Sequence, residues 1–355
     1  MSFLAAIAVL AVLILVHELG HFIAARSQGI YVNRFSLGFG PIIWKYQGLE
    51  TEYAVRAFPL GGFVGFPDDD PDSDIPPQDP NLLRNRPILD RAIVISAGVI
   101  ANLIFAYLLL ALQFGIVGVP EGFNFQPGAI VQPASETSIA YQAGIRDGDI
   151  ILAVNNQEIP ASKEALSVLR QQIQTRANQE LDVKIQREQE QLSFKLTPEA
   201  DKDGNGIIGI KLISPNGKPI YRHTGNIAEI LSIAANRYQQ IFFGIVQGFG
   251  QLVTKFGETA GQVAGPVKIV KMGANIAQND AGNLFTFAAL ISINLAIINI
   301  LPLPALDGGQ LAFLLIEGLR GKPLPTRIQD GVMQTGLVLL LGLGIFLIVK
   351  EALFQ

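Results

Sequence analysis

The chain contains no cysteine and is poor in charged residues and in histidine. Of its 355 residues, 16% are Asp, Glu, Lys or Arg, whereas soluble domains average about 25%. The absence of cysteine excludes disulfides and thiolate ligands for a metal. Because only three histidines are present, any histidine-rich metal site must use His17, His21, His223 and nearby carboxylates. The mild net charge of −4 lacks the basic excess typical of nucleic-acid binding, and we expect no such partner.

Long apolar runs take the place of charge. Hydrophobic residues make up 49% of the chain, and the mean hydropathy is +0.36. A helix needs roughly 20 apolar residues to cross a bilayer, and the runs that reach this length lie near residues 3–25, 92–118, 284–304 and 331–350. The first has neither a basic start nor a small-residue cleavage site, so we expect it to be retained. The pattern predicts a polytopic α-helical membrane protein with about four transmembrane helices.

The first apolar run ends in His17-Glu18-Leu19-Gly20-His21. Histidines at positions i and i+4 share one helix face and can bind one Zn²⁺ through their imidazole nitrogens. Glu18 lies beside them and can act as a general base toward a metal-activated water. Ionisable residues within an apolar span are costly and are usually functional. The motif therefore indicates metal-assisted hydrolysis at membrane depth.

The third ligand follows from the expected topology. Lys and Arg are concentrated between the first two runs and between the last two, which predicts that both loops are cytoplasmic. The first and third runs then point the same way, and their ends lie at similar depth. Asp307 follows the third run after two helix-breaking prolines, whereas His223 falls on the opposite side. We expect Asp307 to be the ligand; the structural alternative is an N-cap of a helix starting near Gly309.

Two segments have the pattern of β-structure. Residues 30–67 alternate in polarity and are rich in glycine, which predicts strands of a membrane-associated hairpin or, equally, of a small cytoplasmic one. Residues 127–213 predict short strands, tight turns and a helix over 162–177. Within them, Ala143-Gly-Ile-Arg-Asp-Gly-Asp-Ile-Ile151 resembles the signature of PDZ domains. Such domains bind peptides by adding a strand to an exposed sheet edge.

These features divide the chain into four parts. We predict an N-terminal membrane part (1–126), a PDZ-like domain (127–213), an amphipathic linker (214–283) and a C-terminal membrane part (284–355). The stretch 226–256 is amphipathic and is expected on the membrane surface, with a further span as the alternative. The run from Asp201 begins like a calcium loop, but its twelfth position is Leu212, so we expect a polar turn.

Two motifs together resemble the site-2 protease family of intramembrane metalloproteases. They are His17-Glu-Leu-Gly-His21 and Asn-x-x-Pro-x-Pro-x-Leu-Asp-Gly over 299–308. With the PDZ-like insert, the plan is similar to that of bacterial sigma-E-type regulators and their cyanobacterial and plastid relatives. The resemblance implies zinc as the cofactor, Glu18 as the base, and His17, His21 and Asp307 as ligands. The single PDZ-like signature departs from relatives that carry two such domains in tandem.

The resemblance also implies roles for three asparagines. Gly98-x-x-x-Asn102 matches a family pattern in the second span, where Asn102 would bind substrate backbone or stabilise an oxyanion. The structural alternative for Asn102 is a buried amide that joins helices. Asn294 and Asn299 would hold an unwound substrate. The hairpin within 30–67 would pair with an extended substrate strand.

The implied activity is cleavage of transmembrane segments of single-pass membrane proteins, such as anti-sigma factors or signal-peptide remnants. A monomer is expected in the inner membrane of a bacterium or its cyanobacterial or plastid equivalent. Its active site would face the cytoplasm, and the PDZ-like domain would lie outside, binding or excluding substrate. An ion or solute transporter is one alternative, although no inverted repeat is visible. A non-catalytic PDZ scaffold is the other, although a scaffold has no need of Glu18.

Overall fold

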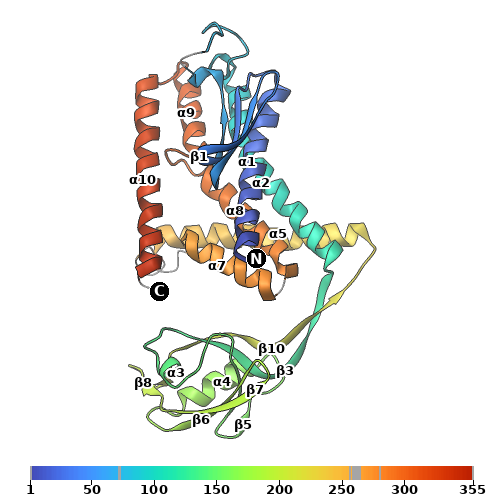
Figure 1. The fold of residues 1–355 in the computed structure, drawn as a ribbon, viewed down its shortest axis with the longest axis vertical. Helices are drawn as coiled ribbons and strands as arrows, with labels where there is room; N and C mark the ends of the chain where they lie inside the picture. Colours follow the sequence, from blue (N-terminus) through green and yellow to red (C-terminus); the bar gives the residue numbers. More distant parts are fainter. Residues whose placement is uncertain (1, 71–72, 256, 258–264, 280, 354–355) are drawn as a thin grey trace. The chain divides into compact units, whose positions relative to one another are not determined.

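A computed structural model describes residues 2–70, 73–255, 257, 265–279 and 281–353. The chain forms two compact units, which we call the helical unit (1–118 with 223–355) and the sheet unit (119–222) (Figure 1). The predicted limits of the inserted domain, 127 and 213, both fall inside the sheet unit. The unit is longer because strands β3 and β10 continue pairing beyond those limits.

Three helices of the described chain are long and apolar enough to cross a membrane. They are α1 (Ser2–Ser27), α2 (Ile88–Ile116) and α10 (Thr326–Leu353). The remaining predicted span forms α8 (Leu284–Ile300), which is apolar but only 17 residues long. At 1.5 Å per residue, that is roughly 25 Å. Helix α8 stops before its predicted end because Pro302 disfavours helical backbone at Leu301, which is extended.

Two further helices of this unit are amphipathic rather than uniformly apolar. Helix α5 (Ile227–Thr254) and helix α7 (Pro266–Asn279) run across the direction of α10 (Figure 1). Helix α5 packs on α2, where the Tyr107 hydroxyl donates to the Leu231 carbonyl at 3.1 Å. It covers most of the predicted amphipathic stretch, whose residue 256 lies outside the described residues.

Residues 30–67 form the predicted strands, here β1 (Arg34–Gln47) and β2 (Glu52–Gly65). Each strand bends, so β1 residues 34–37 pair with both 52–55 and 62–65, while 42–47 pair with 52–56. Gly38, Gly40 and Gly61 adopt positive φ at the bends, a conformation that other residues rarely tolerate. The sheet is anchored to the end of α1 by a small apolar cluster that includes Ala25, Ile30 and Val32.

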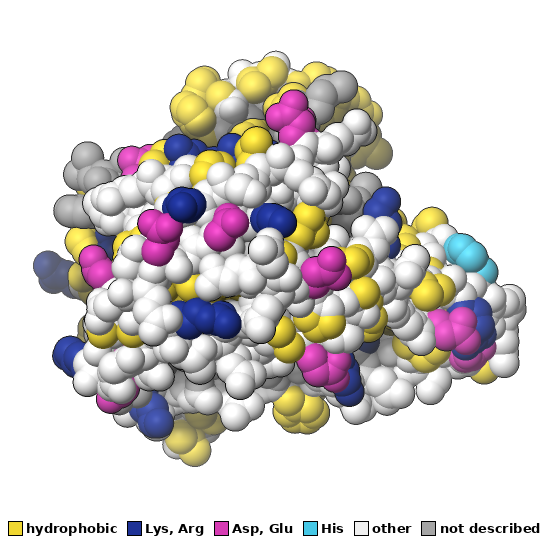
Figure 2. Space-filling view, turned by 90° about the horizontal axis from the view of Figure 1, so that it is seen from below, with side chains coloured by type: hydrophobic (Ala, Val, Ile, Leu, Met, Phe, Trp, Pro, Cys, Tyr) yellow, Lys and Arg dark blue, Asp and Glu magenta, His cyan; other side chains and the backbone are white. Residues whose placement is uncertain are grey.

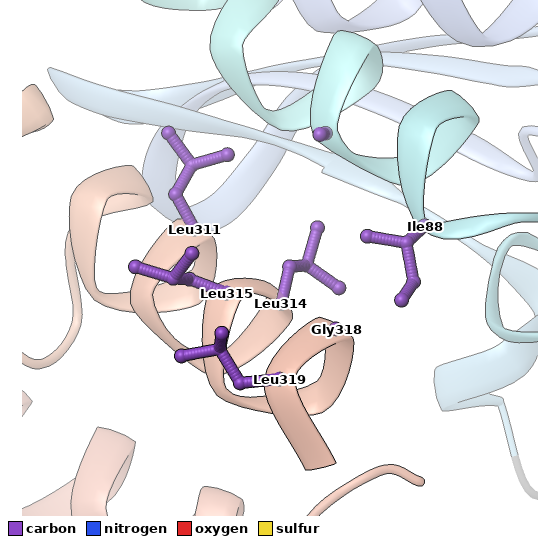
Figure 3. A pocket seen from close by; sticks show the side chains of 7 residues that line it. Ile88, Leu311, Leu314, Leu315, Gly318 and Leu319 are labelled. Carbon is purple, nitrogen blue, oxygen red and sulfur yellow. The ribbon is translucent and has the colours of Figure 1, made fainter. Parts of the chain in front are cut away.

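The helices of the unit are joined by close contacts. A Cβ atom at Gly20 of α1 would lie 2.5 Å from the Ala97 carbonyl oxygen of α2, so only glycine permits this approach. Helix α9 (Asp307–Arg320) is tied to α2 by a half-buried ion pair, Arg91–Glu317, with N···O distances of 2.5 and 3.0 Å. Beside this pair, α2 and α9 enclose an apolar pocket of about 310 Å³, with Leu311, Leu314 and Leu319 on one wall (Figure 3).

The sheet unit is built on an antiparallel sheet. Its strand order is β10-β3-β4-β6-β7, with β5 beside β4. The elements of this unit are β3 (Val119–Pro133), α3 (Ile139–Gln142), β4 (Ile150–Val154), β5 (Gln157–Glu158), α4 (Ala165–Gln174), β6 (Leu181–Arg187), β7 (Glu190–Leu196), β8 (Glu199–Ala200), β9 (Gly206–Ile207) and β10 (Ile210–Arg222). Alternating side chains of the strands and one face of α4 form its apolar core. On the face seen from below Figure 1, acidic and basic side chains are interspersed (Figure 2).

Candidate metal centre

Helix α1 presents His17 and His21 on one face. The helical repeat brings their Nε2 atoms to 3.2 Å from each other, with the ring planes almost perpendicular. Both side chains are nearly buried, with 11% and 12% of their surface exposed. Two imidazole nitrogens therefore converge on one point in the C-terminal part of an otherwise apolar helix, as their spacing predicted.

The junction between α8 and α9 supplies Asp307. After Ile300 the backbone extends, turns, and enters α9 with Asp307 as its first helical residue. The N-cap of that helix is Leu306, so the alternative role of Asp307 as an N-cap is wrong. A Cβ atom at Gly308 would overlap the carbonyl oxygens of Ile300 and Leu301. Glycine at this position is therefore required for the turn that delivers the carboxylate.

The three predicted ligands lie together. Asp307 Oδ2 is 3.3 Å from His17 Nε2 and 3.5 Å from His21 Nε2, and one ligand atom from each residue lies within 4.8 Å of the others. Among the described residues, Oδ2 is a buried oxygen without a hydrogen-bond partner. An unpaired buried carboxylate oxygen facing two imidazole nitrogens fits a metal cation. Two nitrogens and one oxygen also form a ligand set that leaves a position open for catalysis.

Both histidines are held from behind by α2. The carbonyl oxygen of Val94 lies 2.8 Å from Nδ1 of His21, and the amide of Asn102 lies 3.3 Å from Nδ1 of His17. The Ser292 hydroxyl of α8 donates to the backbone carbonyl of Asn102 at 2.8 Å. Asn102 is completely buried between helices. The structure therefore brings Asn102 to the ligands, and its predicted role toward substrate stays a prediction.

Gly98 makes room for this arrangement. A Cβ atom there would lie 2.7 Å from Cε1 of His21 and 2.8 Å from Cε1 of His17. Real Cβ atoms avoid such contacts, so a side chain at this position would displace the imidazoles. In the sequence Gly98 was only part of a matching pattern. The structure explains why glycine stands there, because α1 passes close over α2 at this position.

Glu18 lies at the side of the triad and against the β1–β2 sheet. A Cβ atom at Gly62 of β2 would be 2.8 Å from Cγ of Glu18 and 2.9 Å from the Ser36 carbonyl oxygen. The backbone of β2 therefore passes directly beside the predicted base. The contact of Gly62 with Glu18 and that of Val94 with His21 are made by backbone atoms. No pattern of side chains in the sequence could therefore predict them.

Among the described residues, no hydrogen bond or ion pair joins the other residues considered for the site to the triad. Asn294 donates to the Leu290 carbonyl oxygen of its own helix at 3.1 Å. Asn299 is half-buried in the last turn of α8. His223 is exposed at the boundary of the two units. Their predicted roles toward substrate stay predictions.

The apolar helices define an integral membrane protein. Its helices carry two histidines, one carboxylate and an adjacent glutamate, which are the residues of a metal-dependent hydrolase. The model of peptidase family M50 matches residues 5–343. The chain therefore belongs to peptidase family M50, the site-2 protease family, and is a membrane metalloprotease. The resemblance seen in the motifs is confirmed.

Several relatives are similar over nearly the whole chain. A protein of Nostoc sp. named as a zinc metalloprotease is 68% identical, over 99% of this chain and 96% of its own. The membrane metalloprotease ARASP, chloroplastic, of Arabidopsis thaliana is 46% identical, over 99% and 79%. The regulator of sigma-E protease RseP of Escherichia coli is 30% identical, over 96% of each.

Among solved structures, the PDZ domain of an SdrC-like protein from Listeria innocua matches 25% of this chain and 97% of its own. Its sequence identity is 20% and its TM-score 0.21. These values are too low to assign a fold to the sheet unit.

Proposed function

We propose that this metalloprotease uses zinc to hydrolyse peptide bonds within the transmembrane segments of single-pass membrane proteins. The observation that carries the proposal is the buried, unpaired Oδ2 of Asp307 facing Nε2 of both His17 and His21. The two histidines lie in the C-terminal part of apolar helix α1. The names of the relatives, which include zinc metalloproteases and regulators of sigma-E and sigma-W, support the metal and the signalling context.

In this mechanism His17, His21 and Asp307 hold the ion, and their neighbours position it. A bound Zn²⁺ supplies Lewis-acid activation of water and of the scissile carbonyl. Glu18 accepts the proton of the attacking water and delivers it to the leaving amine. Its side chain is held between the triad and the β2 backbone at Gly62, which limits its motion to the reaction centre.

The β1–β2 sheet offers a way to present the substrate. Residues 62–65 pair with β1 along one side only, within the described residues, and pass beside Glu18. An extended substrate strand can use the other side for backbone hydrogen bonds. Helical substrate carbonyls are already bonded and shielded, so unwinding must precede cleavage. Substrates with helix-weakening residues near the cut are therefore favoured, and Asn294 and Asn299 are candidates for holding the unwound segment.

The proposed topology has about four spans with the triad toward the cytoplasm. The described ends of α1 and α10 lie at the same end of the helical unit, near α5 and α7 (Figure 1). This supports termini on one side of the membrane and α5 along its surface. The sheet unit would then be extracytoplasmic, in a bacterial inner membrane or a cyanobacterial or plastid equivalent. There it would act as a PDZ-like domain that binds a peptide or excludes bulky substrates.

The test compares wild type with Glu18→Gln on a single-pass model substrate in detergent, with zinc measured on both preparations. We expect zinc in both proteins and cleavage by wild type only, because the amide keeps its shape but cannot take a proton. Cleavage by Glu18→Gln would remove Glu18 from its role. Wild type without bound zinc would overturn the ligand assignment. A substrate whose transmembrane segment is replaced by polyleucine is the matched control for the unwinding requirement.

A further inference from the structure

Asn102 occupies an unusual place for a residue expected to touch substrate. It belongs to α2, is 0% exposed, and its amide nitrogen Nδ2 lies 3.3 Å from Nδ1 of His17 on α1. Its backbone is fixed by the Ser292 hydroxyl. Among the described residues, the one hydrogen-bond partner that its side chain has in the proposed reaction centre is a ligand histidine.

The two histidines reveal which nitrogen each must offer to a metal. Nδ1 of His21 lies 2.8 Å from the carbonyl oxygen of Val94, which can only accept a hydrogen bond. The proton of neutral His21 is therefore on Nδ1, and the lone pair of Nε2 is free for the metal. His17 likewise directs Nε2 toward Asp307, at 3.3 Å. A metal bound there also requires the proton of His17 on Nδ1, which then needs an acceptor.

Asn102 is placed to be that acceptor. In the structure the NH₂ group faces His17, with Nδ2 of Asn102 3.3 Å from Nδ1; in that orientation Nδ1 would have to accept, and the proton would move to Nε2 and block the metal. A half-turn of the amide exchanges oxygen and nitrogen without changing its shape. Among the described residues, Oδ1 of Asn102 has no other hydrogen-bond partner, so it is available for this bond.

We infer that Oδ1 of Asn102 accepts a hydrogen bond from Nδ1–H of His17, and that Asn102 is a positioning residue for the metal ligand. The inference rests on the proposed function, since it assumes the metal at the triad. Val94, Gly98 and Asn102 recur every fourth residue and share one face of α2. The first orients His21, the second leaves room for both imidazoles, and the third orients His17.

The experiment measures zinc affinity by chelator competition on the metal-free, full-length protein in detergent. Asn102→Leu keeps the branched shape, although leucine is larger, and removes the acceptor, so we expect zinc binding about 10- to 100-fold weaker. Asn102→Asp keeps an acceptor and should stay within a few-fold of wild type. The visible absorption of the Co²⁺-loaded proteins gives a second readout, because a reoriented imidazole changes the ligand field.

The matched control is Gln113→Leu. Gln113 is also a buried amide of α2, but it bonds Thr286 rather than a metal ligand. We expect it to lower stability while zinc affinity and the Co²⁺ spectrum stay those of wild type. If Asn102→Leu does not fold, Asn102→Ala replaces it, with the same expected loss of affinity.

The outcomes separate this inference from the proposed function. Wild-type zinc affinity in a folded Asn102→Leu or Asn102→Ala protein would overturn the inference while the triad stands. So would an equally weak Asn102→Asp. A variant that binds zinc normally but cleaves slowly would instead assign Asn102 to substrate. Wild type that binds no zinc would overturn the proposed function, and the inference with it.

Discussion

Each unit contains an aspartate with at least one buried oxygen, and the two carboxylates differ in how these oxygens are bonded. Asp149 of the sheet unit is 1% exposed, and both its oxygens accept hydrogen bonds from Arg187 at 2.8 Å, with a further one from the Arg146 backbone. These bonds raise the pKa of the Arg187 guanidinium. Asp307 of the helical unit instead leaves Oδ2 unpaired, facing two imidazoles.

This contrast separates a structural carboxylate from a functional one. A buried polar atom without a partner costs about 1–3 kcal/mol, so a fold tolerates it where something else binds. Both oxygens of Asp149 accept hydrogen bonds from residues of its own unit, so neither is left available for a ligand. Oδ2 of Asp307 has no hydrogen-bond partner among the described residues, and it lies where α1 presents two imidazole nitrogens.

The largest expected effect concerns the metal. In Asp307→Asn the neutral amide oxygen is a poor ligand, and we expect zinc affinity to fall by more than about 100-fold, beyond the loss typical of outer-shell changes. Asp149→Asn should bind zinc as wild type does. Zinc per protein after dialysis, by elemental analysis, measures both. Stoichiometric zinc in Asp307→Asn would show that Asp307 differs from Asp149 in no way that matters for the metal.

The reverse effect is expected on stability. Asp149→Ala removes the partner of Arg187 and leaves the Arg146 amide unpaired, which should cost the sheet unit about 2–4 kcal/mol. The control is Asp147→Ala, whose exposed carboxylate accepts, among the described residues, only a 3.3 Å hydrogen bond from Gln132. We expect a change within about 0.5 kcal/mol there. Hydrogen exchange on the full-length protein measures the stability of the sheet unit. Equal effects of the two changes would refute the structural role of Asp149.

The sequence predicted which three residues come together better than it predicted their surroundings. His17 and His21 follow from helical spacing, and Asp307 follows from topology and from the absence of competing acids. Nothing local distinguishes Asp307-Gly308 from Asp147-Gly148, because an Asp-Gly pair is equally typical of a plain turn. Whether an acid is paired depends on residues distant in the chain, such as Arg187 for Asp149.

The fold was predictable where periodicity is strong. Helices α1, α2 and α10 and the strands of 30–67 lie where the patterns indicated. The end of α8 was set too late, because Pro302 acts on the residue before it. The bends of β1 and β2 and the contacts of Val94 and Gly62 were not predictable, since they depend on backbone approach between elements far apart in sequence.

A smaller effect tests how closely α1 and α2 must approach at the metal centre. Gly98→Ala would press a methyl group onto both imidazoles, and overpacking of this kind typically costs about 1–3 kcal/mol. We expect this cost to appear as weaker zinc binding. Gly115→Ala is the control in the same helix, because its nearest atom is Cδ1 of Ile230 at 3.9 Å. There alanine should stabilise by up to about 1 kcal/mol, and zinc affinity should not change. Equal zinc affinity in the two variants would mean that α2 moves away without disturbing the ligands.

The smallest effect is expected from Asp201, an acid of the sheet unit that is hydrogen-bonded but only half-buried. Its Oδ1 accepts from the backbone amides of Asn205 and Asp203, each at 2.8 Å, as in a polar turn. The bond from Asn205, with that from Asp203, holds the pKa of Asp201 below its ordinary value of 3.8. The unfolded chain therefore binds this proton more tightly, so the ionised carboxylate stabilises the fold at neutral pH, and that contribution fades as pH falls through the lowered pKa.

Asp201→Asn should accordingly be slightly less stable than wild type at pH 7 and equal to it in strong acid. Millimolar Ca²⁺ should leave the unfolding midpoint of both proteins unchanged, since the turn's own amides already occupy the carboxylate. Thermal unfolding across pH, with and without Ca²⁺, measures both. A rise of the wild-type midpoint with Ca²⁺ that Asp201→Asn lacks would show that a bonded carboxylate can still bind a cation. Hydrogen bonding alone would then no longer separate Asp149 from Asp307, and burial would have to enter the criterion.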